Sequence, residues 1–440
     1  MAEDSRARLK EWLASGAVRL EPLSFSQREL WESSIVPPGD SCNHICVFME
    51  VAGKVSKEDC LAAMQELVDR HEVMRLSILP GKNGPVQMIR REFPAAMRFS
   101  DLAPDASLED AMLEIFEEPF DLLRGPLYRV HVFRRGEGDH VLVMPIHHAI
   151  ADGWTLGVFV ENLAAAYLHI AMRLPGKLPP LPLSYSEWAA AERAAWTSGR
   201  LQDTAKYWKE HLQGSPRLWD AIPHETHRLV RTTSAISAEL TTAVRDLAKR
   251  SDATLFSTLL AGFQLALAEW TGERDLVVGS PVANRTKAAV REAMGYCSGI
   301  VPIRSLVDPD RSLEDSVRAA HASAMDAFAN AMPFAELVRA VEIHPAPHRN
   351  PIFDVRFALQ NHPIPDTVVP GFSVKLHMRS TGTARCDLGC ELTEMGDGLE
   401  IVWLYRKEKF TQSDIDELER LFLTALAGNS PELASVGYAD

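Results

Sequence analysis

The stretch HVLVMPIHHAIADGWT at 140–155 decides the fold of this 440-residue chain. Its first half is an apolar run and predicts a buried strand over about 140–148. With RVHVFRR at 129–135 and the turn GEGD between them, it predicts a β-hairpin. The segment after it predicts a long helix from about Thr155 to Met172. Residues 147–153, HHAIADG, therefore lie where a strand ends and a helix begins.

We expect the functional residues at that junction, because the end of a strand fixes the backbone while its side chains reach a cleft. Successive strand residues face opposite ways, so one of His147 and His148 is expected in the cleft and the other in the scaffold. A neutral imidazole there can accept a proton from an amine or alcohol, and the positive end of the following helix disfavours imidazolium. Asp152 is a catalytic partner or a structural anchor. Gly153 removes a side chain where a substrate arm passes close to the backbone.

A non-catalytic interpretation of the junction also has to be weighed. One histidine would then cap the strand, and the other would be buried with its hydrogen bonds satisfied. Two adjacent histidines with an aspartate and a glycine at one strand–helix junction argue against that interpretation.

Strands and helices alternate along the chain, which predicts an α/β protein in two halves. The proline-rich stretch RLPGKLPPLPLSY at 173–185 is the best linker and divides the chain near residue 180. We expect an N-terminal extension over 1–22, a first lobe over 23–178 that holds HHAIADG, and a second lobe over 179–440. The predicted helices of the second half cover 241–250, 254–270 and 411–427, and its predicted strands cover 275–282 and 300–304. Paired residues that signal helix starts are Ser56 with Asp59, Ser107 with Asp110, Ser312 with Asp315 and Thr411 with Asp414.

The composition and net charge of the chain limit the kinds of partner that we expect it to bind. Hydrophobic residues make up 46% and charged residues 24% of the chain, which is typical of a soluble globular protein. The net charge of −14 argues against nucleic acid or an anionic membrane as the main partner. No run of 18 apolar residues occurs and the N-terminus is charged, so we expect a cytoplasmic protein.

Two cysteine pairs have the C-x3-C spacing of some zinc sites: Cys42 with Cys46, and Cys386 with Cys390. Both pairs lie in segments that are typical of strands. Positions i and i+4 on one strand are roughly 13 Å apart, too far to share a metal. We therefore expect buried, reduced thiols and no metal site.

At HHAIADG the sequence resembles the condensation domains of nonribosomal peptide synthetases, whose signature is HHxxxDG. The resemblance extends from about Leu23 to Phe422. Cys297, Ser298, Gly299 and Ile300 depart from the usual residues of the fifth motif. The segments that resemble family motifs are LSFSQRELW at 23–31, RHEVMRLSI at 70–78, PFDLLRGPLYRV at 119–130, YSEWA at 185–189, VVGSPVANR at 277–285, MGYCSGIVPIR at 294–304, MPF at 332–334 and RNPIF at 349–353.

The resemblance implies roles for the site residues. His148 is expected to be catalytic, as a general base or by positioning the nucleophile and stabilising the tetrahedral intermediate, and His147 to be structural. Asp152 is expected to form a buried ion pair with Arg285, and Gly153 to leave room for a phosphopantetheine arm. The implied fold is a V-shaped pseudo-dimer of two chloramphenicol acetyltransferase-like lobes with a tunnel between them.

The implied reaction transfers an acyl or peptidyl group from a carrier-protein thioester to an amine or hydroxyl, in natural-product (antibiotic) biosynthesis. The expected partners are an acyl or peptidyl carrier protein, whose phosphopantetheine is used as substrate, and a small-molecule or carrier-bound acceptor. The chain itself is expected to bind no cofactor and to act as a monomer. Without room for a carrier after Ala427, it is expected to be freestanding, or else a domain cut from a larger synthetase, and residues 1–22 could be a docking remnant. The altered 294–304 segment favours an unusual acceptor, with ester or amide products.

Three alternatives stay open at this point. Gly295-Tyr296-Cys297-Ser298-Gly299 fits a G-x-C-x-G nucleophile elbow of a hydrolase, although IVPIR after it is strand-like and an elbow needs a helix there. A degenerate domain that only binds a carrier is the second, which His148 and Asp152 argue against. Transfer from soluble coenzyme A is the third, and the peptide-synthetase-like motifs argue against it.

Overall fold

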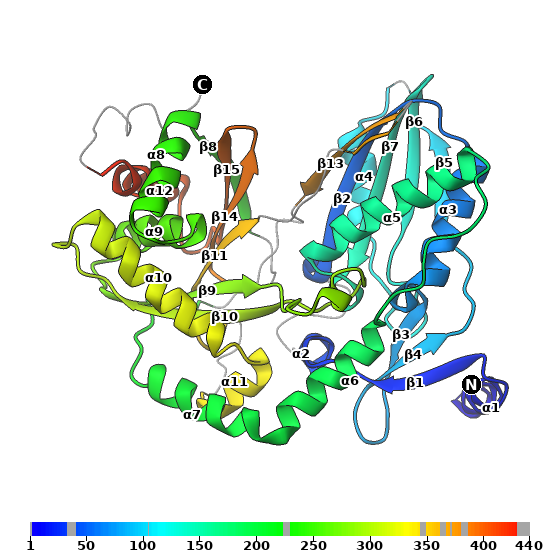
Figure 1. Cartoon of the computed structure of the whole chain (residues 1–440), viewed down its shortest axis with the longest axis horizontal. Coiled ribbons are helices and arrows are strands. Elements are labelled where there is room, and N and C mark those ends of the chain that lie inside the picture. The colour runs from blue at the N-terminus through cyan, green and yellow to red at the C-terminus, as the bar shows by residue number, and fades with distance from the viewer. Residues whose placement is uncertain are drawn as a thin grey trace. The chain divides into compact units, whose positions relative to one another are not determined.

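The chain is described by a computed structural model that covers residues 2–32, 41–103, 105–222, 229–343, 349–360, 367–369, 372–379 and 386–428. It forms two compact units, each built on one six-stranded sheet (Figure 1). The first unit contains residues 1–197, 283–298 and 362–381, and the second contains the rest. The predicted α/β class with two lobes is confirmed.

The first unit has a six-stranded sheet in the order β12-β13-β2-β7-β6-β5 and a three-stranded sheet in the order β1-β4-β3. Every neighbouring pair is antiparallel except β5 with β6. The strands are β1 (Val18–Pro22), β2 (His44–Ala52), β3 (Leu76–Leu79), β4 (Val86–Arg90), β5 (Met97–Asp101), β6 (Val130–Gly136), β7 (Asp139–His147), β12 (Thr367–Val369) and β13 (Phe372–Arg379). The helices are α1 (Ala2–Ala14), α2 (Phe25–Glu32), α3 (Lys57–Arg70), α4 (Leu108–Glu117), α5 (Gly153–Ala171) and α6 (Tyr185–Ala195).

Strand β7 lies between β2 and β6, and both of its faces are covered by other elements. Leu142, Met144 and Ile146 belong to a core cluster with helices α3 and α5, whereas Val141 and Val143 pack with α4 on the other face. An apolar run without polar alternation is what a strand buried on both faces requires. The predicted hairpin of β6 and β7 is confirmed within one residue at each end.

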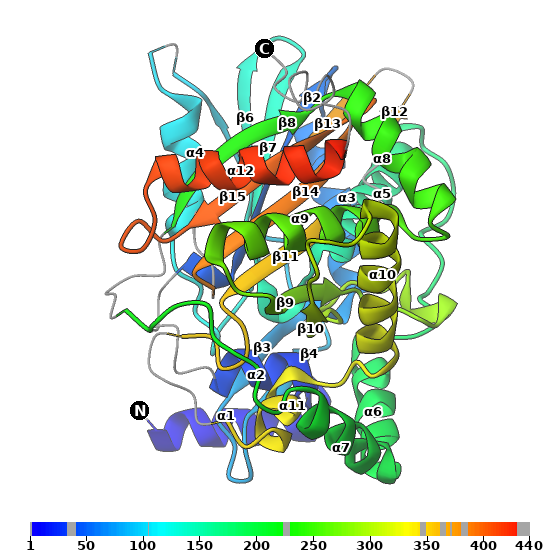
Figure 2. The ribbon, with the colours of Figure 1, turned by 90° about the vertical axis from the view of Figure 1, so that its left-hand side faces the viewer.

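The second unit has the sheet order β10-β9-β11-β14-β15-β8, in which only β11 is parallel to its neighbours. Helices α8, α9, α10 and α12 lie on one side of that sheet (Figure 2). The strands are β8 (Val230–Ile236), β9 (Asp275–Val282), β10 (Gly299–Leu306), β11 (Val355–Gln360), β14 (Leu388–Met395) and β15 (Gly398–Tyr405). The helices are α7 (Leu201–His211), α8 (Ala238–Arg250), α9 (Leu255–Thr271), α10 (Leu313–Ala329), α11 (Phe334–Ala340) and α12 (Gln412–Ala427). All helices and strands predicted for the second half are therefore present.

The two units do not follow the predicted division at 178/179. The boundary falls after Thr197, in a π-helical turn (Trp196–Arg200) between α6 and α7. Two segments from the C-terminal half, 283–298 and 362–381, belong to the first unit. The physical reason for the second is strand pairing, because β13 extends along β2 from Ser373 opposite Ala52 to Arg379 opposite Cys46.

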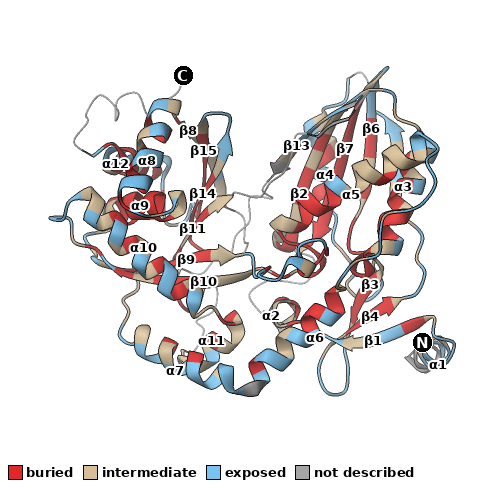
Figure 3. Cartoon of the chain, in the orientation of Figure 1, coloured by how far each residue is buried: buried red, intermediate tan, exposed pale blue. Residues whose placement is uncertain are grey.

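Buried residues concentrate in interior strands of the two six-stranded sheets, such as β7 and β9, as Figure 3 shows. The four predicted start residues, Ser56, Ser107, Ser312 and Thr411, each cap a helix by accepting a backbone N–H three residues on. Among the described residues, no helix combines the length and apolarity needed to cross a membrane.

The cysteine segments are only half strand. Cys46 lies in β2 and Cys390 in β14, but Cys42 lies in a 3-10 turn (Ser41–Asn43) and Cys386 precedes β14. None of the six cysteines, all of which lie in the described part of the chain, forms a disulfide. Burial raises the pKa of Cys60 and of Cys386 to about 12, so these two thiols are protonated near neutral pH.

Candidate active site

The HHAIADG segment connects β7 to α5 through one short 3-10 turn, η3 (His148–Ile150). Helix α5 begins at Gly153, two residues earlier than predicted, because Asp152 is its N-cap. The Asp152 side chain accepts the Thr155 N–H and the Thr155 side chain reaches back to the Asp152 N–H, which makes a capping box. The turn is therefore held at its end by the residues that begin the helix.

His147 is buried, and its ring belongs to the interior of the first unit. Its Nδ1 accepts the N–H of Ala149 at 3.1 Å, so that nitrogen carries no proton. The ring lies edge-on to Phe120 and His44, with centroids 6.1 and 6.0 Å away. This packing suits a structural residue that fixes the start of the turn.

His148 is the histidine of the pair that keeps part of its surface exposed. Its imidazole lies beside the ring of Tyr296, with centroids 4.3 Å apart and planes tilted by 52°. The sequence predicted that the two histidines would differ in this way, but it contained no signal for Tyr296. The Nδ1 atom of His148 is buried. A partly exposed imidazole that packs on an aromatic ring can meet a substrate in a defined orientation.

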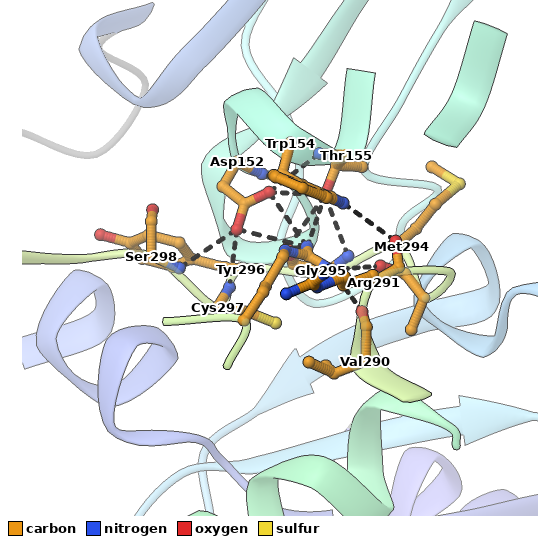
Figure 4. A network of polar contacts seen from close by, with 12 residues as sticks. Asp152, Trp154, Thr155, Val290, Arg291, Met294, Gly295, Tyr296, Cys297 and Ser298 are labelled. Atoms are coloured by element: carbon orange, nitrogen blue, oxygen red, sulfur yellow. Dashed lines mark hydrogen bonds and ion pairs between the residues drawn. The ribbon is translucent and has the colours of Figure 1, made fainter. Parts of the chain in front are cut away.

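Asp152 is almost completely buried, with 1% of its surface exposed, and both oxygens of its carboxylate accept hydrogen bonds. Oδ1 accepts from the N–H and the hydroxyl of Thr155, both at 2.9 Å. Oδ2 accepts from the backbone N–H groups of Cys297 at 3.0 Å and Ser298 at 3.1 Å (Figure 4). A carboxylate with both oxygens occupied by fixed donors serves as an anchor.

Arg285 provides the charge that balances Asp152. Its Nη2 lies 3.1 Å from Asp152 Oδ1, and both side chains are 1% exposed. Nη1 donates to the carbonyls of Val290 and Ala293, and Nη2 also donates to the carbonyl of Gly295. The structure therefore brings Asp152 and Arg285 together, as the family resemblance implied, and the guanidinium also holds the loop 290–295.

Several residues that hold this site were not singled out from the sequence. Gln27 is fully buried and donates from Nε2 to the carbonyl of Ala149 in the histidine turn, at 3.0 Å. Tyr185 donates its hydroxyl to the carbonyl of Tyr296 at 2.9 Å. His71 Nδ1 accepts the N–H of Met294 at 3.4 Å, and burial lowers the pKa of His71 to about 3. Each lies in a segment quoted for the family resemblance, but a single sequence does not indicate which residue of a segment makes the contact.

The G-x-C-x-G segment has neither the geometry nor the chemistry of a nucleophile elbow. Strand β10 starts at Gly299 directly after it, whereas an elbow requires a helix. Cys297 is fully buried, and burial raises the pKa of its thiol well above the usual value. Such a thiol is protonated and inaccessible, which excludes it as a nucleophile in this structure.

Comparison with known families now bears on this geometry. A family model described as Condensation domain matches residues 19–430. The chain belongs to the condensation-domain family. This condensation domain is 32% identical over 423 residues to phosphinothricin tripeptide synthetase PhsC of Streptomyces viridochromogenes, which covers 92% of the chain and 39% of the relative. It is 27% identical to bacitracin synthase 3 of Bacillus licheniformis, over 93% of the chain and 6% of the relative. The chain thus spans well under half the length of these relatives.

Solved structures agree on the fold of the condensation domain. The condensation domain from Monacolin K polyketide synthase MokA matches with a TM-score of 0.82 at 16% identity, over 96% of this chain and 98% of that one. The X-domain from teicoplanin biosynthesis matches with a TM-score of 0.81 at 20% identity, over 95% and 96%. At these identities the likeness concerns the fold alone.

Proposed function

We propose that this condensation domain transfers an acyl or peptidyl group from a carrier-protein phosphopantetheine thioester to an amine or hydroxyl acceptor. The observation that carries the proposal is the HHAIADG junction, in which the imidazole of His148 is partly exposed while His147 and Asp152 are buried in contacts with the scaffold. The relative from Streptomyces viridochromogenes is a tripeptide synthetase, and this supports amide formation as the coarser activity.

His148 is the proposed catalytic residue. Its imidazole accepts the proton of the attacking amine or hydroxyl, or it positions that nucleophile and stabilises the tetrahedral intermediate. In both cases nitrogen or oxygen of the acceptor bonds to the thioester carbonyl carbon, the carbon–sulfur bond breaks, and the proton passes to the leaving thiolate. Asp152 has no free oxygen with which to exchange a proton, so we assign it to the scaffold together with Arg285 and His147.

Gly153 is the proposed point at which the phosphopantetheine arm passes the backbone. It is the first residue of α5, it lies five residues after His148, and it is half-buried. A residue without a side chain at that place leaves room for a substrate arm that ends at the imidazole.

The test is direct. Acyl-loaded carrier proteins are incubated with amine and hydroxyl acceptors, and intact-mass spectrometry follows acyl loss from the carrier and the mass of the product. His148→Ala should retain the wild-type melting temperature and lower turnover by roughly 100-fold or more. Wild-type turnover in a folded His148→Ala protein would contradict the mechanism. Transfer from acyl-coenzyme A at rates equal to those with carriers would contradict the proposed donor.

A further inference from the structure

The buried network around Asp152, together with side chains from α2, α6 and the end of α3, also fixes a second segment, residues 294–298. This segment comes from the C-terminal half of the sequence and makes no regular secondary structure. Because each of its five residues has a backbone group bonded to a side chain of the first unit, its conformation is strongly determined. The contacts are His71 Nδ1 with Met294 N (3.4 Å), Thr155 Oγ1 with Gly295 N (3.1 Å), Tyr185 Oη with Tyr296 O (2.9 Å), Asp152 Oδ2 with Cys297 N (3.0 Å) and Ser298 N (3.1 Å), and Ser26 Oγ with Ser298 O (3.2 Å).

The side chains of this segment differ in burial. Met294 and Cys297 are buried, whereas the ring of Tyr296 is half-buried and lies 4.3 Å from the imidazole of His148, centroid to centroid. The backbone on both sides of Tyr296 is clamped through Gly295 and Cys297. The backbone that carries the Tyr296 ring is therefore held by the same capping box, Asp152 with Thr155, that begins the helix after His148.

We infer that Tyr296 is a positioning residue, whose ring holds the His148 imidazole in the orientation used for transfer. This inference rests on the proposed function. Rotation of an imidazole about its χ2 bond has a broad energy profile, so packing must select its orientation. An aromatic neighbour at this distance favours one arrangement by about 2- to 10-fold. A small misplacement of a catalytic group can cost far more than that in rate.

Gly295 couples the network to the Tyr296 ring. A Cβ at this position would overlap the ring of Tyr185, and its φ of +152° is rarely adopted by residues with side chains. The Tyr185 ring therefore packs directly on the backbone next to Tyr296, while its hydroxyl holds the Tyr296 carbonyl. A substitution at Gly295 should therefore shift the backbone and the ring of Tyr296, while the chemical structures of the Tyr185 and Tyr296 side chains stay unchanged.

The experiment compares five single variants, one of which is His148→Ala, and one double variant in the carrier-transfer assay described above. Tyr296→Phe keeps the ring, and Tyr296→Leu removes it. Gly295→Ala shifts the ring through the backbone. Trp154→Phe is the matched control, because it deletes the bond from Trp154 Nε1 to the Arg291 carbonyl (2.9 Å) and loosens the same loop without touching His148. The double variant is His148→Ala with Tyr296→Leu.

We expect Tyr296→Phe to stay within about 2-fold of wild type and Tyr296→Leu to lose about 10-fold in kcat, with little change in KM for the carrier. Gly295→Ala should lose at least as much, and more than Trp154→Phe. In the His148→Ala background, Tyr296→Leu should have no further effect, because the ring acts through the imidazole. The inference would be overturned if Tyr296→Leu had the kcat of the wild type. It would also be overturned if Tyr296→Leu lowered kcat by the same factor in the His148→Ala background as in the wild type.

Nuclear magnetic resonance separates this inference from the proposed function. The imidazole CH protons of His148 should show a ring-current displacement that Tyr296→Phe retains and Tyr296→Leu removes. If His148→Ala stays fully active, the catalytic proposal fails while the displacement still reports the contact. If the displacement is absent from wild type, the inference fails whatever the activity of His148→Ala.

Discussion

At the scale of single residues, the histidine turn combines one partly exposed imidazole with polar side chains that are committed to buried contacts. His148 is partly exposed, whereas Asp152 and Arg285 bond to each other and to backbone groups. A buried ion pair of this kind need not add much stability by itself, but losing one partner leaves a buried charge uncompensated. The prediction for this pair therefore concerns folding rather than proton transfer.

We expect Asp152→Ala and Arg285→Ala each to lower the free energy of unfolding by about 3–5 kcal/mol. The double variant should cost much less than the sum, because removing both partners leaves no unpaired charge. Chemical denaturation of the four proteins measures these terms. The control is Asp101→Ala, which breaks an exposed pair with Arg134 (2.6 Å) and should change the melting temperature little. Additive losses at Asp152 and Arg285 would contradict the coupling.

Glu192 on α6 gives the site a pH-dependent neighbour. Its Oε1 accepts from Asn284 Nδ2 at 3.1 Å, one residue before Arg285, and Oε2 is buried without a hydrogen-bond partner among the described residues. Burial raises the pKa of Glu192 to about 7, against the opposing effects of Asn284, the Phe25 amide and Arg193. Between about pH 4.5 and pH 7, the carboxyl of Glu192 is therefore more often protonated in the folded chain than in the unfolded chain.

A raised carboxyl pKa stabilises the fold at low pH, fully below the unfolded pKa of about 4.5, and this stability is lost as the pH rises to about 7. We therefore expect Glu192→Gln to raise the melting temperature at pH 8 and to leave it nearly unchanged at pH 4.5. Melting curves of both proteins across this range test the sign. A Glu192→Gln protein that is less stable than wild type at pH 8 would show that the folded state prefers the charged carboxylate.

At the scale of helices and strands, the sequence predicted most elements because their signals are local. The caps at Ser56, Ser107, Ser312 and Thr411 act within three residues, and the apolar run of β7 reports burial on both faces. The start of α5 was predicted two residues late, because a capping box formed by Asp152 with Thr155 extends the helix past its apolar pattern. The contacts of Gln27 and Tyr296 are long-range, and no spacing rule in one sequence indicates them.

Contacts between motif segments explain one glycine in the second unit. Gly279 lies in β9, and a Cβ there would overlap the ring of Phe353, which is 2% exposed. The Phe353 ring also packs on Phe334 at 5.9 Å between centroids. Three segments that resemble family motifs thus meet where one strand residue has no side chain.

We expect Gly279→Ala to lower the free energy of unfolding by about 1–3 kcal/mol, because a rigid buried ring must move to admit the methyl group. Gly389→Ala is the matched control. It lies in β14 of the same sheet, and its added Cβ would meet Leu404 Cβ at an ordinary 3.6 Å. Denaturant titration of both variants measures the difference. Equal stability of the two variants would show that the Phe353 ring yields without cost.

At the scale of the whole chain, the two units are interleaved in sequence. Strand β13 pairs with β2 after some 320 intervening residues, and Arg285 reaches Asp152 across 133 positions. The sequence predicted two lobes from one proline-rich linker, but a linker marks only where the chain leaves a unit. It does not indicate that later segments return to the first one, because short returning segments such as 372–379 look like ordinary strands of the second half.

We expect that residues 1–197 on their own do not fold cooperatively. Such a fragment lacks β13, so β2 becomes an unpaired edge strand, and it lacks Arg285, so Asp152 would be buried without its counter-charge. The control is the full chain cut by a specific protease at a site inserted beside Gly199, which is exposed in the turn between α6 and α7. The cut chain keeps residues 283–298 and 362–381, so its first unit should stay folded. Circular dichroism melting and amide spectra compare the two. A cooperative transition in the isolated fragment, at the wild-type melting temperature, would show that residues 283–298 and 362–381 add nothing to the stability of the first unit. If the cut chain instead separated into unfolded halves, these two segments would stabilise the first unit only when the chain is intact.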